Sequence, residues 1–461
     1  MALPSVLEGI VAKRRTHLPA IRERLAHVDL DTLPRSERSF YDALNGTNRF
    51  IMECKSASPS LGLIREHYEP GTIARVYSRY ASAISVLCEP ERFGGDYDHL
   101  QTVALSTHLP VLCKDFIIDP IQVYAARYFG ADAILLMMSI VDDETYGELK
   151  QLADALGLDV LTEAITEEEV ARAVAFGVDV IGINNRDLHD LTIDLNRTAQ
   201  LAPLVPEGKV VVSESGIRNN LTVRQHGAHA NAFLVGSQLT GTPDIDRAAR
   251  ELVFGSNKVC GLTSWSAAQA ARAAGAVYGG LIFEEASPRN VSRETALDII
   301  AHEPDLTYVA VSRRTTGWEE LALDGIDSFQ IHAPYQGSTE AELELINSVR
   351  AVAGERQVWR AIDMTATHGP ELATALVDAA DLLILDSGPG GTGTSFDWTT
   401  IPDSIKEKSL LAGGLNPSNL AEALRVGTVG LDLNSGLEIN GRKDAGLIAQ
   451  TFNLIRHFTY Y

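Results

Sequence analysis

The chain has 461 residues, which is more than one ordinary compact domain contains and enough for two domains of about 200 to 250 residues. With 45% hydrophobic and 22% charged residues and a mean hydropathy near zero, it is not a disordered chain, a collagen-like fibre or a small disulfide scaffold. The 39 basic and 61 acidic residues give a net charge of −22, which argues against non-specific binding to nucleic acid. A small anionic substrate remains compatible, because one pocket can be locally positive.

The cysteines and the N-terminus indicate the compartment. Cys54, Cys88, Cys113 and Cys260 form no CxxC pair, so we expect no structural metal site. Three of the four lie in apolar runs and are predicted to be reduced, buried thiols, as in a cytoplasmic protein. The stretch MALPSVLEGIVAKRRTHL places its basic cluster after the apolar part, the wrong order for a signal peptide, and the most apolar window, 131–141, is too short to span a membrane. We expect a cytoplasmic protein that binds no membrane.

Short apolar runs rich in β-branched residues recur along the chain, separated by stretches with helical spacing such as 70–82 and 119–131. In the first half the runs are 49–55, 82–88, 110–115, 132–137, 158–163, 179–184, 209–215 and 231–237. In the second half they are 257–262, 276–283, 307–312, 327–332, 356–362, 381–386, 409–415 and 429–435. Continuous apolar runs are typical of parallel strands that are covered on both faces.

Eight strand–helix units in each half predict an α/β fold of two consecutive (β/α)8 TIM barrels, with a doubly wound open sheet as the alternative. Gly130, Gly177 and Gly275, each followed by Ala or Val, are predicted to end helices. The first 48 residues precede the first strand and are predicted to add helices. The boundary is expected near residues 254–256, giving domains 1–255 and 256–461.

Polar and charged side chains stand where the runs of the first half end, the edge at which TIM barrels place their chemistry. Glu53 and Lys55 share one face of the first run, because side chains alternate along a strand. The later runs end at or just before Lys114, Glu163, Asn184, Arg186, Glu214 and Ser215. Any one of these would be read as a solvated loop charge. Two lysines and three glutamates at one barrel mouth instead predict a site in which pKa values are pushed apart for acid and base roles.

The second half has a sparser set. Cys260 lies in its first run, Arg289 follows the second, and His332 and Asp386 end the fourth and sixth. A single buried cysteine is more often a core residue, but pairing with Asp386 across a barrel mouth would favour catalysis.

Small residues follow the seventh and eighth runs of both halves. They are Ser215, Gly216, Gly236 and Ser237 in the first half and Gly413, Gly414, Ser435 and Gly436 in the second. Their backbone N–H groups can surround a phosphate, which many TIM barrels hold at this place. The loop GPGGTGTSFDW after Asp386 is either a flexible linker or a wall of the second pocket, and it lacks the Lys-Ser/Thr ending of a P-loop.

These residues lie in segments that resemble two known families. FIMECKSASPS (which contains Ser58), VLCKDFIIDP, LTE, GINNRDL, VSESGI and FLVGS are similar to indole-3-glycerol phosphate synthase. KVCGLT, GGLIFEEASPRNV, LLILDS, GGTGTSFDW, LAGGLNPSN and GLDLNSGLE are similar to phosphoribosylanthranilate isomerase. The resemblance covers both halves nearly end to end, in the order found in the bifunctional enzymes of bacterial tryptophan synthesis.

For the second barrel the resemblance implies an Amadori rearrangement of N-(5′-phosphoribosyl)anthranilate to 1-(2-carboxyphenylamino)-1-deoxyribulose 5-phosphate. Asp386 would be the general acid that opens the sugar ring, and Cys260 the base that takes the C2′ proton. A cysteine is a base only as the thiolate, so we expect a locally lowered pKa. Arg289 would hold the anthranilate carboxylate and His332 would contact the substrate.

For the first barrel the resemblance implies closure of the indole ring with loss of carbon dioxide and water. Lys114 would be the principal general acid and Glu163 the base, while Lys55 would bind the departing carboxylate or share the acid role. The remaining pocket residues implied by the resemblance are Glu53, Ser58, Asn184, Arg186, Glu214 and Ser215. The resemblance implies phosphorylated anthranilate–sugar substrates and no cofactor, and we expect a monomer.

Two alternatives remain open. One is a different phosphate-binding barrel, such as a Schiff-base aldolase that uses Lys55 or Lys114 as an amine nucleophile. The other is that only the first barrel is catalytic and the second is a binding or stabilising module. The segments QIHAP, which contains His332, and VSRRTT, residues 311–316, depart from the isomerase pattern and motivate this second alternative.

Overall fold

The computed structural model describes residues 6–58, 61–187, 189–388 and 395–460. The chain divides into two compact units, Met1–Ala249 with Thr459–Tyr461 and Arg250–Phe458. The division falls within helix α12 (Ile245–Phe254).

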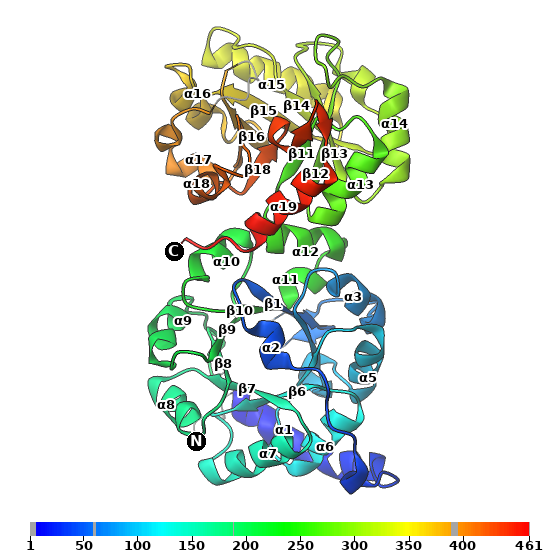
Figure 1. Ribbon diagram of the computed structural model, residues 1–461, viewed down its shortest axis with the longest axis vertical. Coiled ribbons are helices and arrows are strands. Elements are labelled where there is room, and N and C mark those ends of the chain that lie inside the picture. Colours follow the sequence, from blue (N-terminus) through cyan, green and yellow to red (C-terminus); the bar gives the residue numbers. More distant parts are fainter. Residues whose placement is uncertain (1–5, 59–60, 188, 389–394, 461) are drawn as a thin grey trace. The chain divides into compact units, whose positions relative to one another are not determined.

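The first unit is a closed barrel of eight parallel strands (Figure 1). Its strands are β1 (Arg49–Cys54), β4 (Ala83–Leu87), β5 (Val111–Lys114), β6 (Ala133–Met137), β7 (Asp159–Ala164), β8 (Val180–Asn184), β9 (Val210–Glu214) and β10 (Ala232–Val235). β1 pairs with both β4 and β10, which closes the sheet. A two-stranded hairpin, β2 (Ala57–Ser58) and β3 (Gly62–Leu63), follows β1.

Helices connect consecutive strands of this barrel and precede the first one. They are α1 (Val6–Arg24), η1 (Leu30–Thr32), α2 (Phe40–Leu44), α3 (Pro70–Tyr77), α4 (Pro90–Phe93), α5 (Tyr97–Ser106), α6 (Pro120–Tyr128), α7 (Asp143–Ala155), α8 (Glu167–Ala175), α9 (Asn196–Leu201), η2 (Ala202–Leu204), α10 (Asn220–His226) and α11 (Ser237–Thr240). The prediction of extra helices before the first strand is confirmed by α1 and α2.

The second unit is also a closed barrel of eight parallel strands. They are β11 (Lys258–Cys260), β12 (Tyr278–Ile282), β13 (Thr307–Ser312), β14 (Ile326–Ile331), β15 (Gln357–Asp363), β16 (Leu382–Asp386), β17 (Ser409–Leu411) and β18 (Gly430–Leu433). The remaining elements are α13 (Trp265–Ala274), α14 (Arg293–His302), η3 (Trp318–Leu321), α15 (Thr339–Ala353), α16 (Gly369–Leu376), η4 (Trp398–Thr400), α17 (Asp403–Lys406), α18 (Leu420–Arg425), η5 (Ser435–Leu437), β19 (Glu438–Ile439), β20 (Arg442–Lys443) and α19 (Ala445–Arg456).

Every predicted apolar run coincides with one barrel strand, so the predicted fold of two TIM barrels is confirmed and the open sheet is excluded. The strands bury nearly all their residues because the helices cover one face and the barrel interior the other. Gly130, Gly177 and Gly275 adopt positive φ after α6, α8 and α13, as predicted for residues that end helices.

The N-terminal helix reaches the strand end at which Lys114 lies. α1 buries Leu7 and Ile10 in the core of the first barrel. Its Arg14, 2% exposed, places Nη2 at 2.5 Å from Oδ2 of Asp115, and the Tyr97 hydroxyl donates to the same oxygen at 2.8 Å. Asp115 immediately follows Lys114, so the extra helix fixes the backbone beside a predicted catalytic residue.

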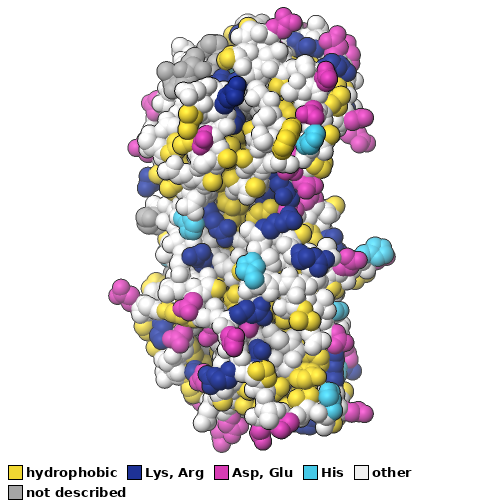
Figure 2. Space-filling model, turned by 45° about the vertical axis from the view of Figure 1, so that its right-hand side comes forward, with side chains coloured by type: hydrophobic (Ala, Val, Ile, Leu, Met, Phe, Trp, Pro, Cys, Tyr) yellow, Lys and Arg dark blue, Asp and Glu magenta, His cyan; other side chains and the backbone are white. Residues whose placement is uncertain are grey.

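The surface carries both signs of charge. On the face drawn in Figure 2, acidic side chains lie at many separate points with Lys and Arg side chains between them. All four cysteines are buried free thiols, as predicted for three of them. No helix within the described residues is long and apolar enough to cross a membrane.

Candidate active sites of the two barrels

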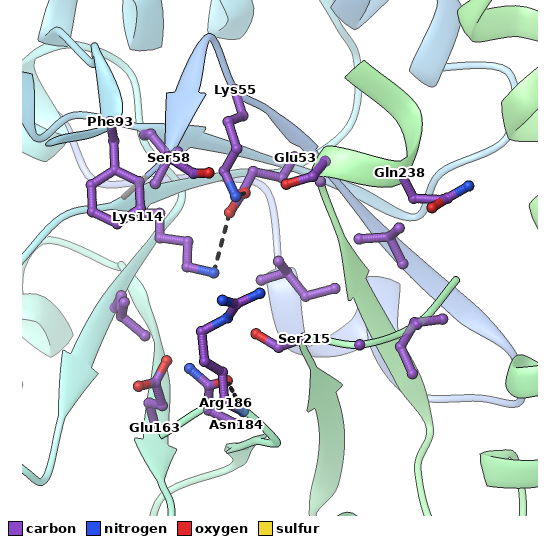
Figure 3. Close-up of a pocket in the computed structure, with 18 of the residues that line it drawn as sticks. Glu53, Lys55, Ser58, Phe93, Lys114, Glu163, Asn184, Arg186, Ser215 and Gln238 are labelled. Carbon is purple, nitrogen blue, oxygen red and sulfur yellow. Dashed lines mark hydrogen bonds and ion pairs between the residues drawn. The ribbon is translucent and has the colours of Figure 1, made fainter. Parts of the chain in front are cut away.

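The first barrel has a cavity of about 420 Å³ at the carboxyl ends of its strands. Most of the predicted site residues line it, and Figure 3 shows their side chains converging from different strands. They are Glu53, Lys55, Ser58, Lys114, Glu163, Asn184, Arg186, Ser215, Gly216, Gly236 and Ser237. Glu214 differs, because it is 0% exposed and lies behind Lys114 instead of in the cavity wall.

Two lysines and two glutamates of this site form a chain of ion pairs. Oε1 of Glu53 lies 2.7 Å from Nζ of Lys55, and Oε2 lies 3.2 Å from Nζ of Lys114. Nζ of Lys114 lies 3.3 Å from Oε2 of Glu214. Lys114 is therefore held between two carboxylates, and Glu53 between two ammonium groups.

These contacts separate the pKa values of the carboxyl groups. Burial alone would raise the pKa of Glu53, but the ammonium groups of Lys114 and Lys55 outweigh it and lower that pKa to about 2. Burial and the neighbouring Glu214 carboxylate raise the pKa of Glu163 to about 8, against the opposing effect of Lys114. Burial would lower the pKa of Lys114, but Glu53, Glu214 and Glu163 raise it above its usual value. The site keeps its lysine charged and makes Glu163 titrate near neutrality.

The opposite wall supplies polar groups from the ends of β8 and β9. Oδ1 of Asn184 accepts from the backbone N–H of Arg186 at 3.0 Å. Burial lowers the pKa of Arg186, and no carboxylate in the described part of the chain lies within ion-pair distance of its guanidinium. Arg186 is thus a cation in the cavity wall that is available to an anion.

The small residues after β9 and β10 form a backbone-lined part of the same cavity. Ser215 and Gly216 both adopt positive φ, at 67° and 82°, which turns successive backbone N–H groups the same way. Gly236 and Ser237 line the cavity next to them, where α11 begins. All four residues line the first cavity.

Two glycines make room for the buried carboxylates, a function that the sequence patterns did not identify. A Cβ at Gly182 would lie 2.2 Å from Oε1 of Glu214, and a Cβ at Gly236 would lie 2.4 Å from Oε1 of Glu53. Phe93, Arg218 and Gln238 also line the cavity without having been predicted. They lie in the loops and short helices after the strands, where no apolar pattern marks a position.

The second barrel has a cavity of about 560 Å³ at the corresponding strand ends. The predicted residues that line it are Cys260, Arg289, His332, Asp386, Gly413, Gly414 and Ser435. Gly436 does not line it, because its Cα faces Leu415, where a Cβ would lie 2.0 Å from the carbonyl oxygen. Residues 389–394 of the loop after Asp386 lie outside the described part of the chain.

Cys260 lies above a buried ion pair that the sequence analysis missed. Nζ of Lys258, in the same strand, lies 2.7 Å from Oδ2 of Asp432 and 2.5 Å from Oε1 of Gln330. Burial raises the pKa of Cys260, and the nearby Lys258 ammonium offsets it only in part. This differs from the expected lowering, because the cost of burying a thiolate exceeds the attraction of one ammonium that already pairs with Asp432.

The pKa of Asp386 is shifted in the opposite direction to that of Glu53. It is 8% exposed, and burial raises its pKa to about 7. Nε2 of His332 lies 3.7 Å from its Oδ2, but burial and the nearby Lys258, Arg360 and Arg313 lower the pKa of His332 to about 3. The neutral imidazole therefore leaves Asp386 able to hold a proton near neutral pH.

Arg289 is held by a carboxylate from a distant part of the sequence, in the hairpin after β18. Its Nε and Nη2 donate to Oε1 and Oε2 of Glu438 at 2.7 and 2.8 Å. Nζ of Lys443 also donates to Glu438 and, at 2.9 Å, to Oδ1 of Asn434. Glu438 and Lys443 were not predicted as site residues.

The chain matches known families over both barrels. The model of indole-3-glycerol phosphate synthase matches residues 7–252, and that of N-(5′-phosphoribosyl)anthranilate isomerase matches residues 257–454. Tryptophan biosynthesis protein TrpCF of Corynebacterium glutamicum is 64% identical over 469 residues, with 99% of each chain covered. The protein of the same name from Yersinia pestis is 44% identical over 456 residues, covering 97% of this chain and 92% of that protein.

A solved structure, the phosphoribosylanthranilate isomerase of Thermus thermophilus, is 27% identical with a TM-score of 0.37, over 43% of this chain and 96% of that one. The predicted resemblance is confirmed by the two family matches. The chain therefore belongs, through its first barrel, to the indole-3-glycerol phosphate synthases and, through its second, to the phosphoribosylanthranilate isomerases.

Proposed function

We propose that this chain catalyses two consecutive steps of tryptophan biosynthesis, one in each barrel. The second barrel converts N-(5′-phosphoribosyl)anthranilate to 1-(2-carboxyphenylamino)-1-deoxyribulose 5-phosphate. The first barrel then converts that product to indole-3-glycerol phosphate, carbon dioxide and water. The observation that carries the proposal is that each matched family region contains a cavity lined by its own acid and base.

In the isomerase, Asp386 donates its proton to the ring oxygen of the sugar, which opens the ring and leaves a C1′ iminium. A pKa near 7 supports this role, because the acid must carry a proton at neutral pH. Cys260 then removes the C2′ proton as thiolate, and the resulting enolamine tautomerises to the ketone. Arg289 binds the anthranilate carboxylate and His332 contacts the substrate, while Gly413, Gly414 and Ser435 surround the phosphate.

In the synthase, Lys114 protonates the ketone oxygen while the aromatic carbon that bears the carboxylate attacks the carbonyl carbon. The carboxylate leaves as carbon dioxide, the hydroxyl leaves as water after a second protonation, and Glu163 takes the proton released on aromatisation. Lys55 binds the departing carboxylate or shares the acid role. The raised pKa of Lys114 keeps the ammonium form that a general acid needs.

The other polar groups of the first cavity bind the substrate. Arg186 and Asn184 face its anionic and polar groups, Ser58 lies beside it, and Ser215, Gly216, Gly236 and Ser237 surround the phosphate. Glu53 and Glu214 act through Lys114, to which both are paired.

The Schiff-base alternative is disfavoured by the same contacts. An amine nucleophile must lose its proton, and the two carboxylates beside Lys114 stabilise the ammonium form instead. Reduction with borohydride in the presence of substrate should therefore leave no covalent adduct on Lys55 or Lys114, as measured by peptide mass.

The direct test is incubation of the full chain with N-(5′-phosphoribosyl)anthranilate. Release of carbon dioxide together with the appearance of indole fluorescence is expected, because both steps must occur in sequence. Consumption of the substrate without either signal would refute the synthase assignment. Production of both signals only from the supplied isomerase product would refute the isomerase assignment and favour a non-catalytic second barrel.

A further inference from the structure

The contacts of Arg289 assign a role to two residues beyond the cavity wall. Glu438 and Lys443, in the hairpin β19–β20, do not line the cavity, and their side chains are 6% and 2% exposed. Both connect to Arg289, which does line it. We propose that Glu438 and Lys443 are positioning residues that make Arg289 a receptor selective for a substrate that carries an aromatic carboxylate. This inference rests on the proposed isomerase function.

Glu438 leaves part of the Arg289 guanidinium unoccupied. A guanidinium has five N–H donors, and Glu438 occupies the single N–H of Nε and one N–H of Nη2. The two N–H groups of Nη1 and the second of Nη2 remain. One from each nitrogen forms the end-on fork that fits a second carboxylate. Glu438 therefore contacts the Nε side of the guanidinium and fixes its plane. The end formed by Nη1 and Nη2 is left for the ligand carboxylate.

The second step concerns charge. Arg289 and Glu438 alone would form a neutral pair, which attracts an anion weakly. Lys443 contacts the same carboxylate oxygen, Oε1, that accepts from Nε of Arg289. The three side chains carry two positive charges and one negative charge, so one net positive charge remains for a ligand carboxylate. In a largely buried site that charge is weakly screened by solvent.

The third step concerns the backbone that holds the group in place. Gly261 has φ 71°, and a Cβ there would lie 2.6 Å from Cδ of Arg289 and 2.9 Å from Oδ1 of Asn434. Asn434 lines the cavity and accepts from Nζ of Lys443 through Oδ1 and, at 3.3 Å, through its carbonyl oxygen. The strand end at Gly261 and the hairpin thus hold the stem of Arg289 and the ammonium of Lys443 in a single network.

The test measures how well the isomerase distinguishes N-(5′-phosphoribosyl)anthranilate from the corresponding aniline derivative, which lacks the carboxylate. Lys443→Met removes the net positive charge, so its KM for the anthranilate substrate should rise about tenfold while kcat changes little. Its KM for the aniline derivative should change less than about twofold. Lys443→Arg, which keeps the charge, should remain near wild type.

Glu438→Gln is a second test, because it has two opposing effects on binding of the substrate carboxylate. Loss of the contact that orients Arg289 should weaken binding, whereas loss of one negative charge should strengthen it. Alone, it frees Arg289 to rotate and should also reduce discrimination between the two substrates. Added to Lys443→Met, it restores one net positive charge, so the double variant should have a lower KM for the anthranilate substrate than Lys443→Met alone. Purely structural damage would make the two substitutions additive.

Two controls separate the possible outcomes. Asp378→Asn, at an exposed ion pair with Lys408, should change neither KM. The inhibition constant of inorganic phosphate should be equal in wild type and Lys443→Met. If this constant and both KM values rise equally, the substitution unfolds the site locally, and the proposal is overturned.

Arg289→Met shows which assignment is at fault. If Arg289→Met abolishes discrimination between the two substrates and Lys443→Met does not, only the role proposed for Glu438 and Lys443 fails. If Arg289→Met also leaves discrimination intact, the assignment of Arg289 fails with it.

Discussion

The two barrels use buried carboxyl groups in opposite protonation states. Glu53 is the penultimate residue of β1 and Asp386 the last residue of β16, and they are 2% and 8% exposed. Glu53 contacts the ammonium groups of Lys55 and Lys114, which lower its pKa to about 2. The ion-pair partner at Asp386 is His332, whose own low pKa keeps it neutral, and burial raises the pKa of Asp386 to about 7.

The difference shows what decides the role of a carboxyl group at a strand end. Burial raises the pKa of both groups, and the two ammonium groups that contact Glu53 reverse that effect, whereas the neutral imidazole beside Asp386 does not. In the proposed mechanism the synthase consequently keeps its transferable proton on Lys114, and the isomerase keeps it on Asp386. The same architecture thus supports two acids of different chemistry.

The variants with the largest expected effect remove the proposed acid of each barrel in turn. Lys114→Ala should lower the kcat of the synthase reaction by roughly 10²- to 10⁴-fold, the usual contribution of a general acid. Asp386→Ala should lower that of the isomerase reaction by a similar factor. Each variant should retain the other activity within about twofold, since each acid lies in the cavity of its own barrel. Both rates are measured on the same purified chain.

Exposed partners of surface ion pairs serve as controls for these variants. Lys13→Ala and Asp378→Ala should change neither rate, because both side chains are solvated. If either active-site variant silenced both reactions in a chain that unfolds like the wild type, the two sites would not be independent.

A second test uses pH, because the two essential groups are needed in opposite forms. Asp386 must be protonated and Cys260, whose pKa is raised, must be deprotonated, so kcat/KM of the isomerase should rise only up to the Asp386 pKa of about 7 and then level off, because further gain of thiolate is offset by loss of the Asp386 proton. Glu163 must be deprotonated, so kcat/KM of the synthase should rise towards its pKa of about 8 and then level off. Between pH 7 and 8 the synthase activity should still rise, by up to about tenfold per pH unit where a single group titrates, while the isomerase activity stays level.

The substrate phosphates titrate near pH 6, below this window, and so do not produce the effect. Glu163→Asp should move the synthase profile and leave the isomerase profile in place. Parallel profiles for the two reactions would contradict the contrast between the barrels.

Much of this arrangement could be predicted from the sequence. Continuous apolar runs identified every barrel strand, and the charged residues at their ends identified both cavities because strand ends meet at one edge. Because side chains alternate along a strand, Glu53 and Lys55 were predicted to share one face, and the same alternation places Lys258 and Cys260 on one face. Lys258 lies at the start of a strand, away from the strand ends that mark the candidate sites, and was therefore not predicted.

Other features depend on contacts that no local pattern contains. Arg289 and Glu438 are 149 residues apart, and only the closed barrel brings them together. The raised pKa of Cys260 depends on its complete burial against a Lys258 that is already paired. Glu214 was predicted in the cavity wall, but it lies behind Lys114 because Gly182 leaves room for its carboxylate.

The variant with the smallest expected effect tests the contact between Glu214 and Lys114. In Gly182→Ala the new Cβ would lie 2.2 Å from Oε1 of Glu214, so the carboxylate must move away from its position beside Lys114. Overpacking of this kind costs about 1 to 3 kcal/mol, and we expect a fall in synthase kcat of about three- to tenfold. The fall in synthase rate at high pH, where Lys114 loses its proton, should also shift to lower pH, because one of the carboxylates that raise the pKa of Lys114 is displaced. Gly147→Ala, in helix α7 with its nearest contact at 3.5 Å, is the matched control and should leave the profile unchanged. A fall in rate without the shift would mean that Glu214 supports the packing of the barrel and does not tune the acid.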